Sequence, residues 1–148
     1  MKRVVQIKGN GTWALAQMGD RVSLDAGDRQ RRRIVMTGER GTTFLLDLEQ
    51  PATLRDGDGL VLDDGSVVLV AGKPEPLVEI LTRVKSDIVR LAWHIGNRHA
   101  ELQIVGNALR IRRDHVLEDM LRKLGADLTE IEAAFESISS PPGHDHGS

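Results

Sequence analysis

Five histidines are the side chains of this sequence best suited to bind a metal ion: His94, His99, His115, His144 and His146. Two of them flank Asp145, and alternate imidazoles near a chain end make an adaptable chelating pair. Cysteine is absent, which excludes disulfides, thiol nucleophiles and thiolate ligands. A metal site in this chain must therefore use imidazole, carboxylate or backbone oxygen.

The local sequence around three histidines suggests different roles. His94 lies on the polar side of a predicted helix, which is typical of a solvated side chain. His99 follows the break in that helix. His115 falls in the first turn of a second predicted helix, where the helix dipole disfavours a cation and favours the neutral imidazole that ligates metals.

Motifs for covalent or phosphoryl chemistry are absent. The sequence has no nucleophile elbow, no phosphate-binding loop and no HExxH pair, so we predict that it is not an enzyme. Net charge is −2 and aromatic residues make up 3% of the chain, which argues against a globally basic nucleic-acid binder. No run of 18 apolar residues occurs, so we expect a soluble cytoplasmic protein without a membrane partner.

The first half of the chain reads as short strands separated by turns. The predicted strands cover 4–9, 33–38 and 42–48, followed by a hairpin over 59–72. Asp64 and Gly65 suit a type I′ turn in that hairpin, because both tolerate positive φ. No helical periodicity is present, so residues 1–73 are predicted to form a small all-β domain.

The second half changes character after GKPEP (72–76), which suits an extended linker. A strand is expected over 77–84, then a helix capped by Ser86 that ends near Gly96 and Asn97. A hairpin follows around Gly106, and Asp114 caps a second helix that ends at Gly125.

The segment 126–137 is ambiguous. Thr129 and Glu132 resemble a helix-capping box, whereas the apolar spacing also fits a bulged strand. A strand would complete the order βαββαβ, so we favour it. The predicted fold class is α+β, with the all-β domain followed by a ferredoxin-like βαββαβ domain over 74–138. A flexible, disordered histidine-bearing tail is expected over 139–148.

Two stretches carry a resemblance to a known family. HIGNRH (94–99) and LQIVGNALRIRRDHVLEDMLRKLG (102–125) are similar to the C-terminal metal-binding domain of the urease accessory protein UreE family, which comprises nickel metallochaperones. The segment 28–77 resembles the family's N-terminal β domain. The resemblance covers nearly the whole chain.

The resemblance implies a function and a set of partners. It implies nickel delivery during assembly of the urease metallocentre, with zinc or copper as alternative metals in vitro. It implies a homodimer through the C-terminal domain, and partner docking by the N-terminal domain. The implied partners are the urease apoprotein and the urease accessory proteins, including the GTPase.

The resemblance also implies ligands. His99 is the expected central ligand at the dimer interface, and His115 is an additional site in some members. The tail contributes His144 and His146, while His94 is expected to orient the site. Some members carry another histidine just before the Asp-His-Val element, where this chain has Arg113, and this argues against bulk nickel storage.

Two other functions remain open from the residues alone. Ferredoxin-like domains often bind RNA, although the net charge and the scarcity of aromatic side chains disfavour this. A metallohydrolase based on histidine ligands is the other alternative.

Overall fold

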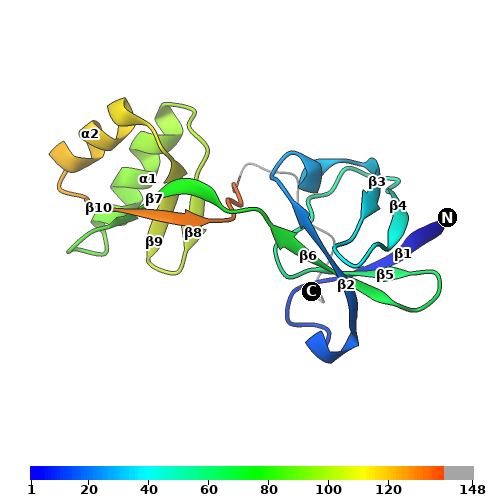
Figure 1. The fold of residues 1–148 in the computed structure, drawn as a ribbon. Coiled ribbons are helices and arrows are strands. Elements are labelled where there is room, and N and C mark those ends of the chain that lie inside the picture. The colour runs from blue at the N-terminus through cyan, green and yellow to red at the C-terminus, as the bar shows by residue number, and fades with distance from the viewer. Residues whose placement is uncertain (139–148) are drawn as a thin grey trace. The chain divides into compact units, whose positions relative to one another are not determined.

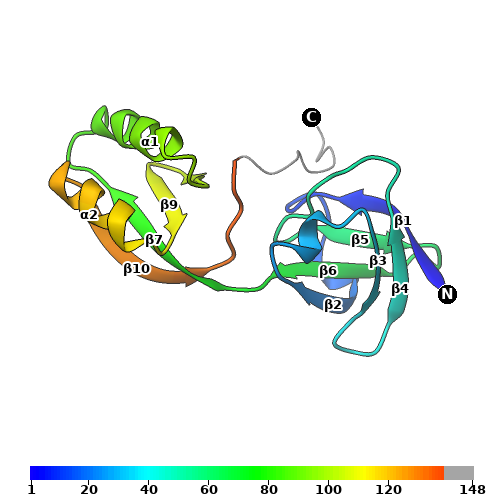
Figure 2. The same cartoon turned by 90° about the horizontal axis from the view of Figure 1, so that it is seen from above.

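The computed structural model describes residues 1–138, which form α and β structure in two compact units (Figures 1 and 2). The first unit runs from Met1 to Lys73, and the second begins at Pro74. The predicted tail, with His144 and His146, lies outside the described residues. No helix in residues 1–138 has both the length and the apolarity needed to span a membrane.

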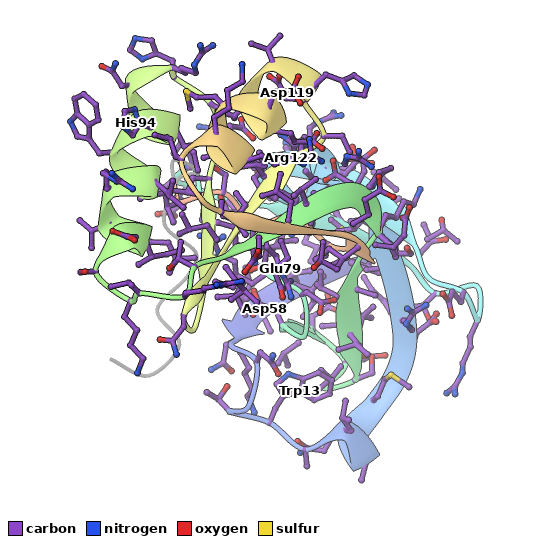
Figure 3. The ribbon with its side chains drawn as sticks, turned by 90° about the vertical axis from the view of Figure 1, so that its left-hand side faces the viewer. Trp13, Asp58, Glu79, His94, Asp119 and Arg122 are labelled. Carbon is purple, nitrogen blue, oxygen red and sulfur yellow. The ribbon has the colours of Figure 1, made fainter. Side chains whose placement is uncertain are left out.

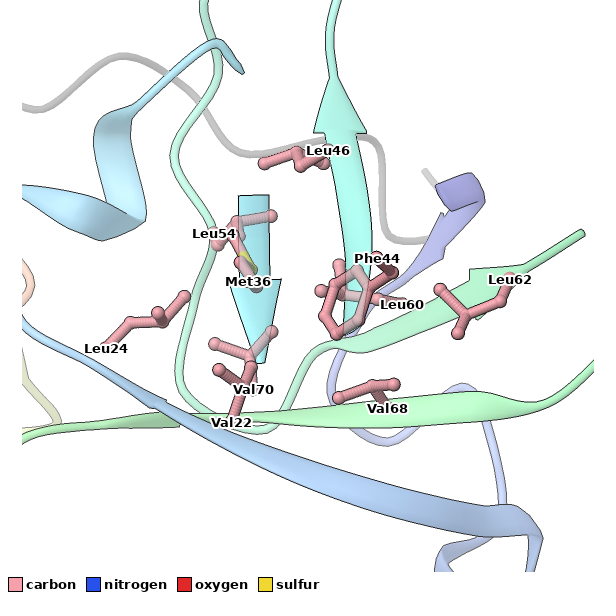
Figure 4. Close-up of a cluster of buried hydrophobic side chains, with 10 residues drawn as sticks. All are labelled: Val22, Leu24, Met36, Phe44, Leu46, Leu54, Leu60, Leu62, Val68 and Val70. Atoms are coloured by element: carbon pink, nitrogen blue, oxygen red, sulfur yellow. The ribbon is translucent and has the colours of Figure 1, made fainter. Parts of the chain in front are cut away.

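The first unit is a six-stranded sheet that curls into a half-barrel, in the order β2-β6-β5-β1-β4-β3. Its strands are β1 (Lys2–Lys8), β2 (Met18–Leu24), β3 (Arg33–Thr37), β4 (Thr43–Asp47), β5 (Gly59–Leu62) and β6 (Val67–Gly72). A single 3₁₀ turn, η1 (Leu15–Gln17), lies between β1 and β2, and another, η2 (Asp28–Gln30), lies between β2 and β3. The inward side chains form one apolar core, shown in Figure 4.

The hairpin predicted over 59–72 is confirmed, but its predicted turn type is wrong. A type I′ turn needs positive φ at both central residues, and only Gly65 has it, at φ 86°. The Gly65 N–H donates to the Leu62 carbonyl (2.9 Å), and the Leu62 N–H donates to the Ser66 carbonyl (2.8 Å). Asp64 instead accepts hydrogen bonds from the Ser66 N–H and hydroxyl, which holds it in ordinary backbone geometry.

Strand β2 was not predicted, because a carboxylate occupies one of its inward positions. Asp20 is buried and accepts hydrogen bonds from the backbone N–H groups of Arg21, Arg40 and Thr42, at 2.7, 2.8 and 3.0 Å. Burial alone raises the pKa of Asp20, but these donors outweigh it and lower the pKa to about 2. The buried Asp20 therefore ties the loop after β3 to β2.

The second unit is a four-stranded sheet in the order β10-β7-β9-β8, with every neighbouring pair antiparallel. Its elements are β7 (Glu75–Leu81), α1 (Asp87–Asn97), β8 (Gln103–Val105), β9 (Ala108–Arg112), α2 (His115–Lys123) and β10 (Asp127–Ala133). The strand favoured over a helix for 126–137 is therefore confirmed by β10.

Both helices cover the same face of this sheet (Figure 1). Leu91 and Ile95 of α1 and Leu117 and Leu121 of α2 are buried against apolar side chains of β7 and β9. Each helix is short, so its stability depends on burying this apolar face rather than on helix propensity. The packing thus places the end of α1 and the start of α2 on one side of the sheet.

Two predicted boundaries of β7 are wrong. The strand ends at Leu81 rather than at residue 84, because its partner β10 begins at Asp127, directly opposite Leu81. Glu75 and Pro76 belong to the strand rather than to a linker, and Pro76 pairs opposite Glu132. Cross-strand pairing, which has no local sequence signal, sets both ends.

Candidate metal site

The end of α1 places His99 in an unusual backbone conformation. The helix ends at Asn97, which confirms the end predicted near Gly96 and Asn97. The His99 N–H donates to the Gly96 carbonyl (2.9 Å), and the Ala100 N–H donates to the Ile95 carbonyl (3.3 Å). These two bonds form a Schellman motif, in which the residue after the cap adopts a left-handed conformation.

His99 is the residue in that left-handed position, with φ 57°. Across residues 1–138 it is the one non-glycine residue with positive φ. Glycine usually occupies such a position, because a side chain there costs about 1 kcal/mol or more. An exposed imidazole held in this strained conformation marks the position as a functional candidate.

His94 lies one turn before the end of α1 and is half-buried. Its ring meets the edge of the Trp93 ring, with centroids 5.0 Å apart and planes 79° apart. Figure 3 shows His94 on α1, with Asp119 and Arg122 on α2. His94 therefore contacts the neighbouring Trp93 ring along the same helix.

His115 is the first residue of α2 and is exposed. The preceding Asp114 caps the helix as predicted, because its Oδ1 accepts a hydrogen bond from the Leu117 N–H (3.0 Å). Ser86, by contrast, occupies the N-cap position of α1 without a side-chain capping bond. The N-terminus of α2 therefore carries a negatively charged cap beside His115, where a bound cation would oppose the helix dipole.

An ion pair between a buried carboxylate and a surface arginine lies next to His115. Glu118 is 2% exposed, and it accepts hydrogen bonds from the Arg113 guanidinium (3.1 and 3.3 Å) and the Asp114 N–H (2.7 Å). Arg113 also contacts Glu130 at 2.7 Å. Arg113 therefore forms ion pairs with Glu118 and Glu130. The resemblance expects a histidine at this position in some relatives.

The pKa of Glu118 lies below its ordinary value. Burial acts to raise it, but the hydrogen bonds from Arg113 and Asp114 and the charge of Arg122 more than compensate. Glu118 is therefore an ionised structural carboxylate, and sequence reasoning missed it. Its signal was an acidic residue four positions after a capping aspartate within an otherwise apolar helical stripe.

The predicted ligands are distributed rather than assembled. His99 and His115 lie at the termini of different helices, and His94 is directed to the Trp93 ring. Within residues 1–138, no three His, Asp or Glu side chains come close enough together to hold a metal ion. Within the described residues, the predicted histidines therefore do not form a three-ligand site.

An apolar stripe on the outer face of α1 leads to His99. Val89 and Trp93 are 69% and 63% exposed, and they lie one turn apart on the same helical face. Gly96 continues this face, and a Cβ added there would meet no atom within 4 Å. Exposed apolar side chains next to a small residue are typical of a surface that packs against another protein.

The fold and the histidines thus define a two-unit α+β protein with a candidate metal site at the end of a helix. Comparison with known families identifies it further. Residues 2–71 match the family described as UreE urease accessory protein, N-terminal domain, and residues 75–148 match its C-terminal domain. The chain belongs to the UreE urease accessory protein family.

Close relatives agree over nearly the whole chain. Three of them, each named urease accessory protein UreE, come from Rhodopseudomonas palustris strain HaA2, Bradyrhizobium sp. strain ORS 278 and Beijerinckia indica. Their identities are 52, 49 and 43%, covering 98, 99 and 99% of this chain and 68, 71 and 87% of the relatives. The resemblance seen in the sequence is confirmed. The chain has a role in urease maturation as an accessory chaperone and is not an enzyme.

Proposed function

We propose that the chain is a cytoplasmic nickel metallochaperone that delivers nickel during assembly of the urease metallocentre. The observation that carries the proposal is His99, an exposed imidazole in a left-handed conformation just beyond α1. Imidazole binds nickel, copper and zinc, and membership of a urease accessory family favours nickel as the cargo.

The helix terminus favours a cation at this position. The last carbonyls of a helix carry partial negative charge, which stabilises a positive ion near the C-terminus. His99 follows the C-terminus of α1, whereas His115 opens α2 at its positive end. The helix dipole therefore favours a cation at His99 and opposes one at His115, where the Asp114 carboxylate offsets part of the dipole.

A homodimer would supply a second His99. One imidazole competes poorly with water for a divalent ion. An isologous interface joins the same patch of two copies, so a residue close to the two-fold axis lies next to its own counterpart. The exposed face of Trp93 and Gly96 leads directly to His99. Packing of the C-terminal half of α1 against a second copy would cover this face and bring two His99 side chains to one ion.

Further ligands would come from the tail. Ile138 donates its N–H to the Leu102 carbonyl (2.7 Å). Leu102 follows His99 by three residues, so the chain after Ile138 starts beside the segment that carries His99. His144 follows six residues later, and six extended residues span at most about 20 Å. We propose that His144 or His146 completes the coordination, with His94 orienting the site and His115 binding metal weakly.

This ligand set suits transfer rather than storage. Without thiolates the site lacks the ligands that lock zinc into closed tetrahedral sites. A few imidazoles from two protomers leave coordination positions open for an acceptor. The proposed acceptors are the urease apoprotein and the other accessory proteins, including the GTPase.

We also propose a role for each unit. The order β7-α1-β8-β9-α2-β10 and the sheet order β10-β7-β9-β8 support a ferredoxin-like domain over 74–138 that dimerises and binds metal. Residues 1–73 would form the partner-docking domain. The sheet face away from the helices carries the ion pairs Arg110–Glu79 and Arg112–Glu75, which does not favour RNA binding.

The deciding experiment is nickel titration of the purified full chain by calorimetry, with the mass of the loaded protein measured by light scattering. The proposal expects one tight nickel per dimer in the wild type. It also expects loss of that site in His99→Ala, with the dimer intact. A His99→Ala protein that keeps one tight nickel per dimer would place the site elsewhere.

The dimer face has its own test. Gly96→Leu adds a side chain where the protomer has open space, so the protomer is expected to fold normally. If the second copy packs there, the variant becomes monomeric and its nickel affinity falls. Lys123→Leu on the exposed face of α2 is the matched control and should remain dimeric. A dimeric Gly96→Leu protein would rule out this face.

A further inference from the structure

An apolar groove lies at the opposite end of α1 from His99. It has a volume of about 560 Å³ and lies between the start of α1, the loop after β7 and the β8–β9 hairpin. Its apolar lining includes Leu81, Ile88, Ile104, Leu109 and Val89, the residue at the far end of the apolar stripe from His99. Three of these large side chains, Leu81, Val89 and Ile104, are exposed, so the groove opens to solvent with apolar walls.

The rim of the groove is positively charged. Arg83 and Lys85 both line it and are exposed. In residues 1–138 neither has a carboxylate partner, and the nearby Asp87 lies 3.9 Å from Arg90 instead. Two cations without counter-charges beside an apolar groove match a ligand that combines bulky apolar groups with carboxylates.

The proposed dimer would leave this groove uncovered. In the proposed dimer, the two-fold axis that relates the two His99 side chains passes near the C-terminus of α1. The helix has 11 residues, which at 1.5 Å per residue places its first turn about 15 Å along the helix from its C-terminal end. A second copy packed around His99 therefore covers Trp93 and Gly96 before it reaches Ile88 and the hairpin.

We propose that this groove is a docking site for a short segment of a partner protein that carries bulky apolar side chains flanked by acidic residues. The apolar side chains would lie against Ile104, Ile88 and Leu109, and the carboxylates would pair with Arg83 and Lys85. The inference rests on the proposed function only in taking the partner from among the urease subunits and accessory proteins. It places a partner contact on the metal-binding unit itself.

The docking mode follows peptide recognition in other grooves. Apolar anchors supply most of the binding free energy, and charges at the rim select the partner and speed its approach. Docking at the start of α1 would leave His99 accessible at the other end of the helix. A partner held there could receive the metal without displacing the second protomer.

The test uses short overlapping peptides that cover the urease subunits and the other urease accessory proteins of the same organism, with the full-length dimer as the labelled probe. We expect the bound peptides to contain bulky apolar residues and net negative charge. For those peptides, Ile104→Asp and the double variant Arg83→Glu/Lys85→Glu should each weaken binding at least about tenfold, or about 1.4 kcal/mol.

Matched controls separate the groove from general surface effects. Val35→Asp changes an apolar side chain of similar exposure, 53% against 55% for Ile104, in the first unit. Lys123→Glu reverses a charge on α2. Both controls should bind the same peptides as the wild type. Peptides that bind groove variants and wild type equally, or a selection of basic peptides, would overturn the proposal.

Two further readouts distinguish this inference from the metal site. His99→Ala should keep peptide binding while it loses nickel, so failure of the nickel site leaves the groove testable. Light scattering on Ile104→Asp should still show a dimer. A monomeric Ile104→Asp protein would show that the second copy occupies the groove and would overturn the proposed partner.

Discussion

His99 and His115 are both exposed and both adjoin a helix terminus, yet their surroundings differ in three respects. His99 follows the negative end of α1, whereas His115 opens α2 at its positive end. His99 has a strained left-handed backbone, whereas His115 begins a regular helix behind a capping aspartate. His99 adjoins an apolar stripe, whereas His115 adjoins the Arg113–Glu118 ion pair.

These differences distinguish two histidines that residue type alone does not separate. The carboxylates beside His115 already have donors: Glu118 accepts from the Arg113 side chain and the Asp114 N–H, and Asp114 accepts from the Leu117 N–H. His99, by contrast, has a strained backbone and lies beside exposed apolar side chains. A metal ion bound by its imidazole would stabilise the strained conformation, and a second copy of the chain would cover the apolar side chains. The contrast favours His99 as the primary ligand.

The largest expected effect is the difference between the two alanine variants. His99→Ala should weaken the tightest nickel site by about 100-fold or more, corresponding to about 2.7 kcal/mol. His115→Ala should leave that site nearly unchanged and reduce only weaker binding. Calorimetry on both variants measures the difference, and equal losses would remove the distinction between the two histidines.

The next effect concerns stability rather than nickel. Glu118→Ala removes the acceptor of the part-buried Asp114 N–H and of the Arg113 guanidinium, and the loss of such hydrogen bonds costs about 1–3 kcal/mol. Nickel affinity should stay unchanged. Asp119→Ala, an exposed neighbour on α2, is the control and should have little effect. Urea unfolding measures the change in the free energy of unfolding. A loss of nickel affinity in Glu118→Ala would contradict the separation of the two helix ends, because it would show that the start of α2 influences the metal site.

His99→Gly should raise stability while removing the metal ligand. Glycine adopts a left-handed conformation freely, so the substitution should gain about 1 kcal/mol in the free energy of unfolding. His115→Gly should lose about as much, because it puts glycine at the start of a helix. Thermal unfolding of the two metal-free variants measures the difference. A His99→Gly protein less stable than the wild type would contradict the strain assigned to the His99 backbone.

Acid should weaken the His115 region through Glu118. Its pKa in the folded protein is lower than in the unfolded chain, so its contribution is complete above about pH 4.5 and decreases as the pH falls further. Glu118→Gln removes this dependence. We expect the stability difference between wild type and Glu118→Gln to shrink between pH 6 and about pH 3, as measured by urea unfolding at each pH. A constant difference would contradict this assignment.

The smallest expected effect comes from the tail. Removing residues 141–148 deletes His144 and His146, and should lower nickel affinity or stoichiometry only modestly while folding and the site at His99 remain. Two imidazoles two residues apart chelate weakly without a third ligand. Complete loss of nickel binding in the truncated protein would instead make the tail part of the primary site.

Local patterns in the sequence determined much of the second unit. Apolar residues at helical spacing identified both helices, and Asp114 identified the start of α2, because periodicity and capping act within a few residues. Turn residues located the hairpins for the same reason. The histidine-bearing segments, together with the resemblance that they carry, identified the family that the comparisons confirm.

Tertiary structure decided the rest. Strand β2 escaped prediction because its inward Asp20 is satisfied by backbone donors from a loop about twenty residues away. Cross-strand partners set the ends of β7. The left-handed φ of His99 arises from hydrogen bonds to the last turn of α1, which override the preference of its own side chain. Such contacts join distant segments or oppose local preferences, so no local pattern records them.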